Sequence, residues 1–227
     1  MKMPTKEDLK YFQSMPLDIK IKMTQTRIRE WVRQYGTSGV YVSFSGGKDS
    51  TVLLHIVRQM YPDVEAVFVD TGLEYPELRQ FVKTFDNVKI LRPEMRFDEV
   101  IKKYGYPIIS KEVSNAIWYA RRGSIWAKNN FNGLNGKGQP HEFKKSMYSK
   151  YKPICEMDFF VSDKCCRVMK EKPLDDYAKL NDKKPITALM ASESKKRETA
   201  WLQTGCNAFN SKKPISKPMS FWTEQDV

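Results

Sequence analysis

The spacing of apolar residues along the chain predicts most of its secondary structure. Spacings of three and four residues predict helices, and the longest such segment, residues 17–35, ends at Gly36, a typical helix stop. Short β-branched and aromatic runs predict strands. Strands are expected at 39–44, 64–69, 87–91 and 185–190, and helices at 51–60, 76–84, 97–104, 110–122 and 193–202. At the start of the chain, Thr5 is a predicted N-cap with Asp8 as the acidic member of a capping box.

The alternation of these strands and helices predicts an α/β fold of Rossmann-like type. It would contain a parallel twisted sheet with helices on both faces. We expect two parts, an N-terminal helical segment over residues 1–36 and one domain over 37–227. In such sheets ligands bind at the carboxyl ends of the strands, near a switch in strand order. Residues 45–50 and 70–72 both follow predicted strands, so they should meet in space.

The periodic pattern dissolves between residues 122 and 152. Residues 129–138 are rich in Gly, Asn and Lys, which is typical of a mobile loop. We expect a flexible insertion here, acting as a lid or a partner-binding loop, with simple flexibility as the alternative. Further on, a helix capped near Ser162 is expected to end at Pro173. Residues 221–227 resemble the first turn of a helix, and from this we expect the chain to be cut from a longer protein.

Composition narrows the class of protein. The longest apolar runs of the 227 residues are four or five residues, far below the roughly 20 that span a bilayer. The charged N-terminus lacks the apolar core of a signal peptide, so a cytoplasmic protein is expected and its four cysteines should be reduced. Residues 121–227 carry 21 Lys/Arg against 12 Asp/Glu. Such a basic half favours an anionic partner, namely polyphosphate, a sulfated nucleotide or RNA, unless it is only a solvated surface.

The loop between the first predicted strand and the next helix has the chemistry of a phosphate site. Two glycines let the backbone approach a ligand closely, and the following helix offers unpaired N–H groups. Hydroxyls and a cation add to this, while Asp49 would hold Mg²⁺ or brace the loop. The spacing is not that of a Walker A motif, because Ser43 stands where that motif needs glycine. The alternative is a tight turn without a ligand. The loop consists of Ser45, Gly46, Gly47, Lys48, Asp49 and Ser50.

Three segments, 43–50, 68–77 and 165–174, resemble the phosphoadenosine phosphosulfate (PAPS) reductase family of the PP-loop adenine nucleotide α-hydrolase-like superfamily. The resemblance runs from about Gly39 to the end of the chain. It implies that the phosphate loop, with Ser43, holds the phosphates of ATP or PAPS, with Lys48 and Asp49 as catalytic residues and Mg²⁺ as a cofactor. It further implies nucleotide contacts by Asp70, Thr71, Gly72, Ser192, Lys195 and Arg197, the last three alternatively forming an ordinary exposed helix N-terminus.

The cysteines have several interpretations. Cys165 and Cys166 open a predicted helix, where its dipole and the neighbouring Lys164 and Arg167 should lower a thiol pKa. The resemblance implies that the pair could hold an iron–sulfur cluster of the [4Fe–4S] type, which needs four thiolates. Its other ligands would be Cys155 and Cys206, or residues beyond this chain. Alternatively, Cys155 is a packed core cysteine.

Three functions follow from this. The first is cleavage of ATP at the α-phosphate with adenylyl transfer to a sulfur-related acceptor, favoured because the loop is intact. The second is a thiol- or iron–sulfur-dependent reduction of PAPS or adenylyl sulfate to sulfite with a thiol reductant. Against it, the C-terminal Glu-Cys-Gly-type segment of the reductases is missing. The third is RNA thiolation or RNA binding, with which four aromatic residues near basic ones are compatible: Trp118, Trp126, Tyr148 and Tyr151. A nucleotide sensor without catalysis is a further alternative.

Overall fold

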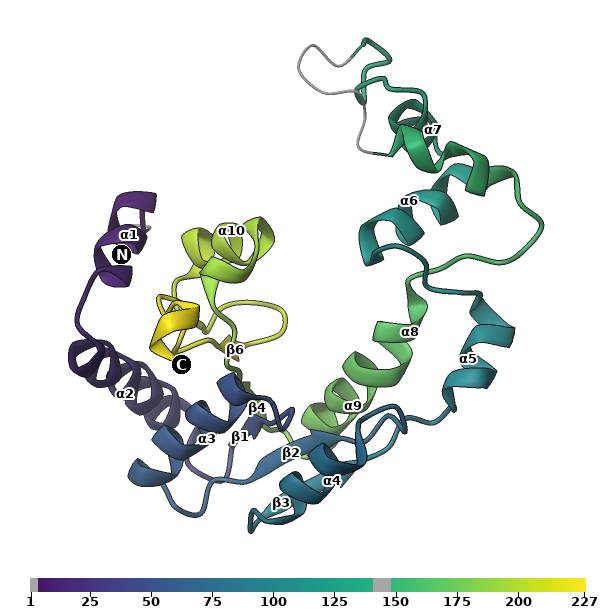
Figure 1. The fold of residues 1–227 in the computed structure, drawn as a ribbon. Coiled ribbons are helices and arrows are strands. Elements are labelled where there is room, and N and C mark those ends of the chain that lie inside the picture. Colours follow the sequence, from purple (N-terminus) through teal and green to yellow (C-terminus); the bar gives the residue numbers. More distant parts are fainter. Residues whose placement is uncertain (1–3, 141–147) are drawn as a thin grey trace. The chain divides into compact units, whose positions relative to one another are not determined.

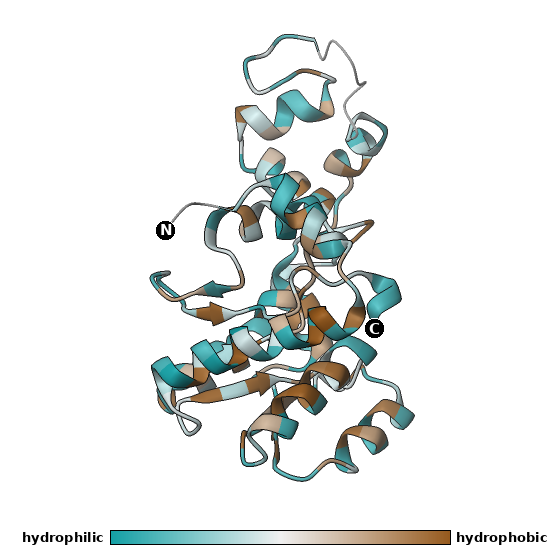
Figure 2. Cartoon of the chain, turned by 90° about the vertical axis from the view of Figure 1, so that its left-hand side faces the viewer, coloured by the Kyte–Doolittle hydropathy of each residue, from teal (hydrophilic) through white to brown (hydrophobic). Residues whose placement is uncertain are grey.

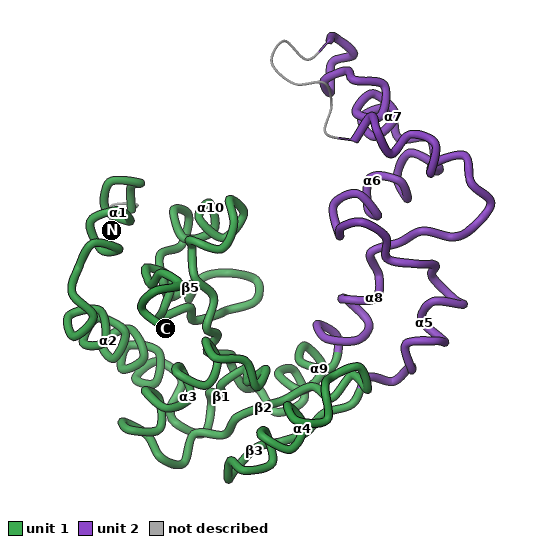
Figure 3. Tube along the Cα trace, in the orientation of Figure 1, with its two compact units in different colours: residues 1–92, 173–227 green, residues 93–172 purple. Residues whose placement is uncertain are grey.

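The computed structural model describes residues 4–140 and 148–227, and the chain divides into two compact units. Unit 1 comprises residues 1–92 and 173–227, and unit 2 comprises residues 93–172 (Figure 3). The boundary expected near residue 36 stays a prediction. Each unit has its own apolar core and is described separately here.

Unit 1 is built around a six-stranded sheet (Figure 1). Its order is β3-β2-β1-β4-β6-β5, and every neighbouring pair is parallel except β5 with β6. The strands are β1 (Val40–Ser43), β2 (Ala66–Val69), β3 (Val88–Leu91), β4 (Lys184–Ile186), β5 (Asn207–Ala208) and β6 (Ile215–Ser216). The α/β fold class with a mostly parallel sheet is thereby confirmed.

Both faces of this sheet are covered, and β1 shows why. Successive side chains of a strand point to opposite faces. Val40 and Val42 belong to one buried cluster and Tyr41 to another, so neither face of β1 meets water. Strands buried in this way read as continuous apolar runs, as the first strand does in the sequence.

The helices of unit 1 present apolar stripes to these clusters, and Figure 2 shows apolar and polar residues alternating along them. On α2, Ile28 and Trp31 are fully buried. The capping box predicted at Thr5 and Asp8 is confirmed at the start of α1. The helices are α1 (Lys6–Gln13), α2 (Leu17–Tyr35), α3 (Lys48–Met60), α4 (Pro76–Lys83), α9 (Lys172–Leu180, whose first residue belongs to unit 2) and α10 (Lys195–Thr204).

Unit 2 is helical and has a smaller core. Its apolar cluster includes Val113, Ile117, Phe131 and Val161. Two isolated bridges, Tyr106 with Val161 and Leu134 with Pro140, take the place of a sheet among the described residues of this unit. Its elements are α5 (Phe97–Tyr104), α6 (Lys111–Arg121), α7 (Ile125–Phe131), the 3₁₀ segment η1 (Ser149–Glu156), α8 (Lys164–Cys166) and the π-helical turn η2 (Arg167–Glu171).

Two expectations from the sequence were wrong. Helical structure does not stop at Pro173 but extends to Leu180. The π-helical turn η2 comes just before Pro173, with the Lys172 N–H donating to the Arg167 carbonyl, and the helix accommodates the proline at this irregularity. Residues 129–131 are the last turn of α7 and not part of a loop. The following turn is fixed by Asn135, whose side chain accepts the N–H groups of Lys137 and Gln139.

The predicted insertion includes residues 141–147, which lie outside the described residues, and its role as a lid or partner loop stays a prediction. Within the described ranges, no helix combines the length and apolarity needed to cross a membrane.

Candidate nucleotide site

The candidate site lies at the carboxyl end of β1, where the strand order reverses. The chain runs from β1 to β2 and β3 on one side, and β4 then pairs with the other side of β1. In doubly wound sheets such a reversal leaves a crevice between the two loops that leave the strands in opposite directions. Here those are the phosphate loop after β1 and the segment after β4. Ser43 closes β1 and pairs with Val67 of β2, which sets the loop beside the turn after β2.

Gly46 gives the phosphate loop its shape. Its φ of 76° is in the left-handed region that residues with a Cβ avoid. A Cβ at this position would also lie 2.9 Å from Cγ2 of Val82 and 3.1 Å from Cγ of Leu78, both on α4. The loop is therefore packed against α4 by its backbone. At Gly47, by contrast, the nearest atom to a built Cβ is the Ser45 Oγ at 3.4 Å. The absent side chain there leaves room for a ligand.

Serine hydroxyls hold the loop closed around the start of α3. The Ser45 and Ser50 hydroxyls are 3.0 Å apart, and Ser50 Oγ also accepts the N–H of Ser45 at 3.1 Å. Gly47 is the N-cap of α3, and no side chain caps the helix there. The first N–H groups of a 13-residue helix are thus available to an anion, together with the positive end of its dipole.

Lys48, the cation of the loop, contacts two carboxylates. Its Nζ donates to Asp49 Oδ1 at 2.8 Å and lies 2.9 Å from Glu224 Oε1. The hydrogen bonds to Asp49 and then to Glu224 raise the pKa of Lys48, so it carries its charge at neutral pH. About half of the Lys48 side chain is exposed, so phosphate could compete for it.

Glu224 is a residue that the sequence analysis missed, and the C-terminal segment places it here. Trp222 is 1% exposed, and its indole N–H donates to Thr24 of α2 at 2.8 Å. Asp226 accepts from the buried Lys20 at 2.7 Å and caps the N–H of Thr223. Both anchors fix the 3₁₀ turn η4 (Glu224–Asp226) between them. Because 176 positions separate Glu224 from Lys48 in sequence, spacing alone offered no signal for this contact.

The turn after β2 holds the second group of predicted residues. Asp70 Oδ1 accepts from the N–H of Gly72 at 3.1 Å and from the Arg79 guanidinium at 2.6 Å. Partial burial acts to raise the pKa of Asp70, but these two donors outweigh it and lower the pKa. Thr71 is held by Glu74, which accepts both its N–H and its hydroxyl. The turn is thus rigid and its carboxylate ionised. Sequence analysis did not assign Glu74 or Arg79 these roles.

The segment after β4 reaches the same region through the C-terminal turn. Ser192 Oγ donates to the carbonyl of Trp222, two residues before Glu224. Lys195 and Arg197 lie in the first turn of α10, capped by Ser194, and each pairs with a nearby glutamate, Lys195 with Glu198 and Arg197 with Glu193. The structure therefore joins Ser192 to the C-terminal segment that carries Glu224. Lys195 and Arg197 instead pair with glutamates of their own segment. Their contact with a nucleotide stays a prediction.

The cysteines differ from expectation in their protonation. Burial raises the pKa of Cys155 and of Cys165, where the neighbouring Cys166 raises it further. At Cys165 the pKa is therefore raised and not lowered as expected, because the thiol is half-buried and lies beside Cys166. Cys206 is 9% exposed in the core of unit 1, and burial raises its pKa. Cys166 is the exposed thiol of the four.

The sequence implies two metal groups, an iron–sulfur cluster and Mg²⁺, and the candidate ligands fit Mg²⁺ better. Among residues 4–140 and 148–227, no three His, Cys, Asp or Glu side chains gather as a metal site. The thiol of Cys206 is enclosed by the core, so it does not fit a four-thiolate cluster, and we derive no step through one. Asp49 and Glu224 both contact Lys48 Nζ, and carboxylate oxygens suit Mg²⁺, which would take the place of that ammonium between them and further ligands from phosphates.

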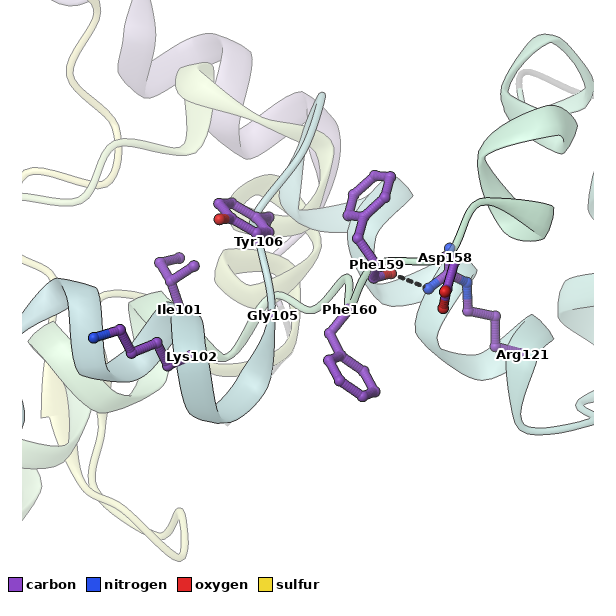
Figure 4. A pocket seen from close by; sticks show the side chains of 8 residues that line it. All are labelled: Ile101, Lys102, Gly105, Tyr106, Arg121, Asp158, Phe159 and Phe160. Carbon is purple, nitrogen blue, oxygen red and sulfur yellow. Dashed lines mark hydrogen bonds between the residues drawn. The ribbon is translucent and has the colours of Figure 1, made fainter.

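Unit 2 contains a separate cavity of about 300 Å³, drawn in Figure 4. Aromatic residues, two cations and the carboxylate of Asp158 line it, and Gly105 closely approaches the backbone of Phe160 there. The rings of Phe159 and Phe160 point in opposite directions in Figure 4, and the Phe160 ring is 77% exposed. Nothing in the sequence pattern indicated this cavity, because it depends on residues from three separate segments.

Fold and site together define a doubly wound α/β protein with a candidate phosphate-binding loop at its topological switch point. Comparison with known proteins names the family. Residues 39–227 match the phosphoadenosine phosphosulfate reductase domain, and the chain belongs to that family.

Individual relatives match shorter stretches of the chain. A phosphoadenosine 5′-phosphosulfate reductase of Xanthomonas euvesicatoria pv. vesicatoria is 28% identical over 120 residues, covering 51% of this chain and 41% of that protein. An adenosine 5′-phosphosulfate reductase of Staphylococcus haemolyticus is 32% identical over 102 residues, covering 42% and 41%. An uncharacterised protein of Methanocaldococcus jannaschii is 38% identical over 73 residues, covering 30% and 18%. The chain thus spans at most about two-fifths of the length of these relatives.

Proposed function

We propose that the protein binds the phosphates of ATP at residues 45–50 and cleaves the nucleotide at the α-phosphate. The observation that carries the proposal is the intact loop: an uncapped helix N-terminus, paired hydroxyls of Ser45 and Ser50, and the exposed cation Lys48 beside two carboxylates. Every element that phosphate recognition needs is present at one strand end.

In the proposed reaction, an oxygen nucleophile forms a bond to the α-phosphorus. The bond from that phosphorus to the α–β bridging oxygen breaks, and pyrophosphate leaves with the electron pair. The nucleophile's proton passes to water. Lys48 and the N–H groups at the start of α3 would stabilise the charge that grows on the leaving group. Asp49 and Glu224 would hold Mg²⁺, which neutralises phosphate charge when bound.

A second candidate is sulfonucleotide reduction, favoured by the names of the relatives and by the exposure of Cys166. A cysteine thiolate would attack the sulfur of PAPS or adenylyl sulfate, forming an S-sulfocysteine and releasing the nucleotide. A dithiol reductant would then attack the cysteine sulfur and release sulfite. The raised pKa values of the other three thiols count against it, because the thiolate is the nucleophile.

One chromatographic assay separates the two. The full chain is incubated anaerobically with Mg-ATP, and in parallel with PAPS plus a dithiol. We expect AMP and pyrophosphate from ATP, and PAPS unchanged. In Lys48→Ala the rate should fall about 10²- to 10³-fold, as for the loss of one transition-state donor. Lys22→Ala, an exposed lysine of α2, serves as the matched control and should keep the wild-type rate.

Two results would contradict the proposal. Adenosine 3′,5′-bisphosphate and sulfite from PAPS, with ATP intact, would establish the reductase instead. A Lys48→Ala variant with the wild-type rate would remove the loop from the site altogether.

A further inference from the structure

Unit 2 carries a concentration of positive charge that the nucleotide site does not use. Its 80 residues hold 16 Lys/Arg against 9 Asp/Glu, a net charge of +7. The 147 residues of unit 1 hold 23 against 18, a net charge of +5. Per residue, unit 2 is therefore between two and three times as basic. Charge of this density attracts polyanions.

Aromatic rings are interleaved with these cations. Within the described part of the chain, all five cation–aromatic pairs lie in unit 2. Other rings of unit 2 are well exposed, among them Tyr106 at 54%, Trp126 at 51% and Tyr119 at 45%, whereas the rings of the five pairs are half-buried. A unit that offers both exposed rings and half-buried rings paired with cations matches what a single-stranded nucleic acid requires, because its bases stack on rings while its phosphates need positive charge.

The best-defined cation–aromatic group is the Trp118 surface, which we define as the half-buried Trp118 with Arg122 and Lys164. The Arg122 guanidinium carbon lies 3.7 Å from the centre of the Trp118 ring, and Lys164 Nζ lies 5.7 Å from it. Trp118 and Arg122 are four residues apart, so they occupy one face at the end of α6. Both cations are exposed. A stacked guanidinium is itself a planar platform on which bases stack.

The cavity of Figure 4 adds a second aromatic site in the same unit. Tyr106, Phe160 and the stem of Lys102 line it, and at about 300 Å³ it has room for a planar base. Arg121, which also lines it, donates to four backbone carbonyls and is thereby fixed in place. The available cation here is Lys102.

We propose that unit 2 binds single-stranded nucleic acid, with the Trp118 surface as its principal contact. An acidic protein would satisfy the cations but leave the exposed rings without a role. A duplex would hide its base faces from those rings. A single strand would use the cations for its phosphates and the exposed rings for its bases. RNA and DNA single strands share this chemistry, and the experiment distinguishes them.

The test uses the full chain and fluorescence anisotropy. The probes are labelled RNA and DNA single strands of about 20 nucleotides and mixed sequence, a duplex of the same sequence, and polyglutamate. We expect binding of a single strand at low salt, weaker binding of the duplex and the weakest binding of polyglutamate. For a single strand, log K should fall with log salt by about 0.7 for each phosphate contact.

Two variants separate stacking from charge. Trp118→Ala should weaken binding about tenfold with little change in salt slope, because stacking of one base is lost. Arg122→Ala combined with Lys164→Ala should reduce the slope by about 1.4, the value for two phosphate contacts. Trp118→Phe should recover most of the affinity. The two cations are exposed, so their removal also tests the proposal if Trp118→Ala impairs folding.

A matched control removes similar groups from unit 1. The variant Tyr11→Ala with Lys22→Ala and Arg33→Ala loses one exposed ring and two exposed cations, and should bind as the wild type does. Lys48→Ala should also bind normally, since the proposal does not rest on the nucleotide site. Absence of single-strand binding at low salt would overturn it. So would equal loss in the control, or polyglutamate binding as tight as that of the single strand.

Discussion

The two units of this chain stabilise their backbones by different means. In unit 1 the strands are paired and buried on both faces, with Val40 and Val42 in one cluster and Tyr41 in another. In unit 2 the described backbone has few strand partners, and one side chain replaces them. Arg121 donates to the carbonyls of Ile154, Cys155, Met157 and Phe159 and so fixes the irregular segment 154–159.

This difference decides what each unit can offer chemically. A sheet with regular crossovers places loops at one edge with little freedom, which suits close recognition of phosphates. A small core surrounded by exposed rings and cations suits a longer, less regular ligand. The proposed nucleotide site of unit 1 therefore depends on the shape of the backbone, and the proposed nucleic-acid surface of unit 2 on its exposed rings and cations.

The largest expected effect concerns the shape of the phosphate loop. Gly46→Ala adds a Cβ at a positive φ and 2.9 Å from Val82. We expect the variant to lose about 2–4 kcal/mol of stability in unit 1, from the left-handed backbone and the forced repacking of α4. Hydrogen exchange at increasing urea, followed peptide by peptide, reports unit 1 separately from unit 2.

Gly47→Ala is the matched control for this prediction. Its φ is −75° and space is open around it, so the loss of stability should be under about 1 kcal/mol. Nucleotide affinity should fall in both variants. Equal stability losses at the two positions would mean that the loop is not shaped by its contact with α4.

The sequence predicted unit 1 well because its signals are local. The bounds of α2, α4 and β2 agree with the periodic pattern to within two residues, and the Thr5 capping box is confirmed. The phosphate loop was also recognisable, since its residues are consecutive. Glu224 was not, because its place depends on the packing of Trp222 and on Asp226 reaching Lys20.

Unit 2 was predicted less completely, for a physical reason. Helices α5 and α6 were found from their apolar spacing, whereas the segment around 150–160 has no such pattern. Its conformation is specified by hydrogen bonds from Arg121, more than 30 positions earlier. Likewise, no spacing rule indicated a π-turn before Pro173. Side-chain hydrogen bonds to distant carbonyls leave no periodic signal.

A smaller effect tests whether Arg121 replaces a sheet in this way. Arg121→Lys keeps the charge but cannot reach four carbonyls with one ammonium group. We expect a loss of about 1–3 kcal/mol, confined to exchange in residues 148–160, because several hydrogen bonds worth about 0.5–1.5 kcal/mol each are lost at this exposed site. Arg122→Lys, one position on, should change exchange by less than about 0.5 kcal/mol. If both variants behave alike, the contrast between the two units is wrong.

The smallest expected effect is a dependence on pH at the C-terminal turn of unit 1. Burial acts to raise the pKa of Asp226, but Lys20 and Thr223 outweigh it and lower the pKa below its usual 3.8. The ion pair therefore stabilises unit 1 above about pH 4, and this contribution disappears as the pH falls through the folded pKa. We expect a loss on the order of 1 kcal/mol, seen as faster exchange in residues 17–24 and 219–227. In Asp226→Asn that acid-induced loss should be absent, while exchange in unit 2 should be the same in both proteins.

Because η4 carries Glu224, the same acidification should also free Lys48, which links the stability of this turn to the occupancy of the phosphate loop. An acid response that is equally large in Asp226→Asn would assign the stabilisation to other carboxylates and remove that link.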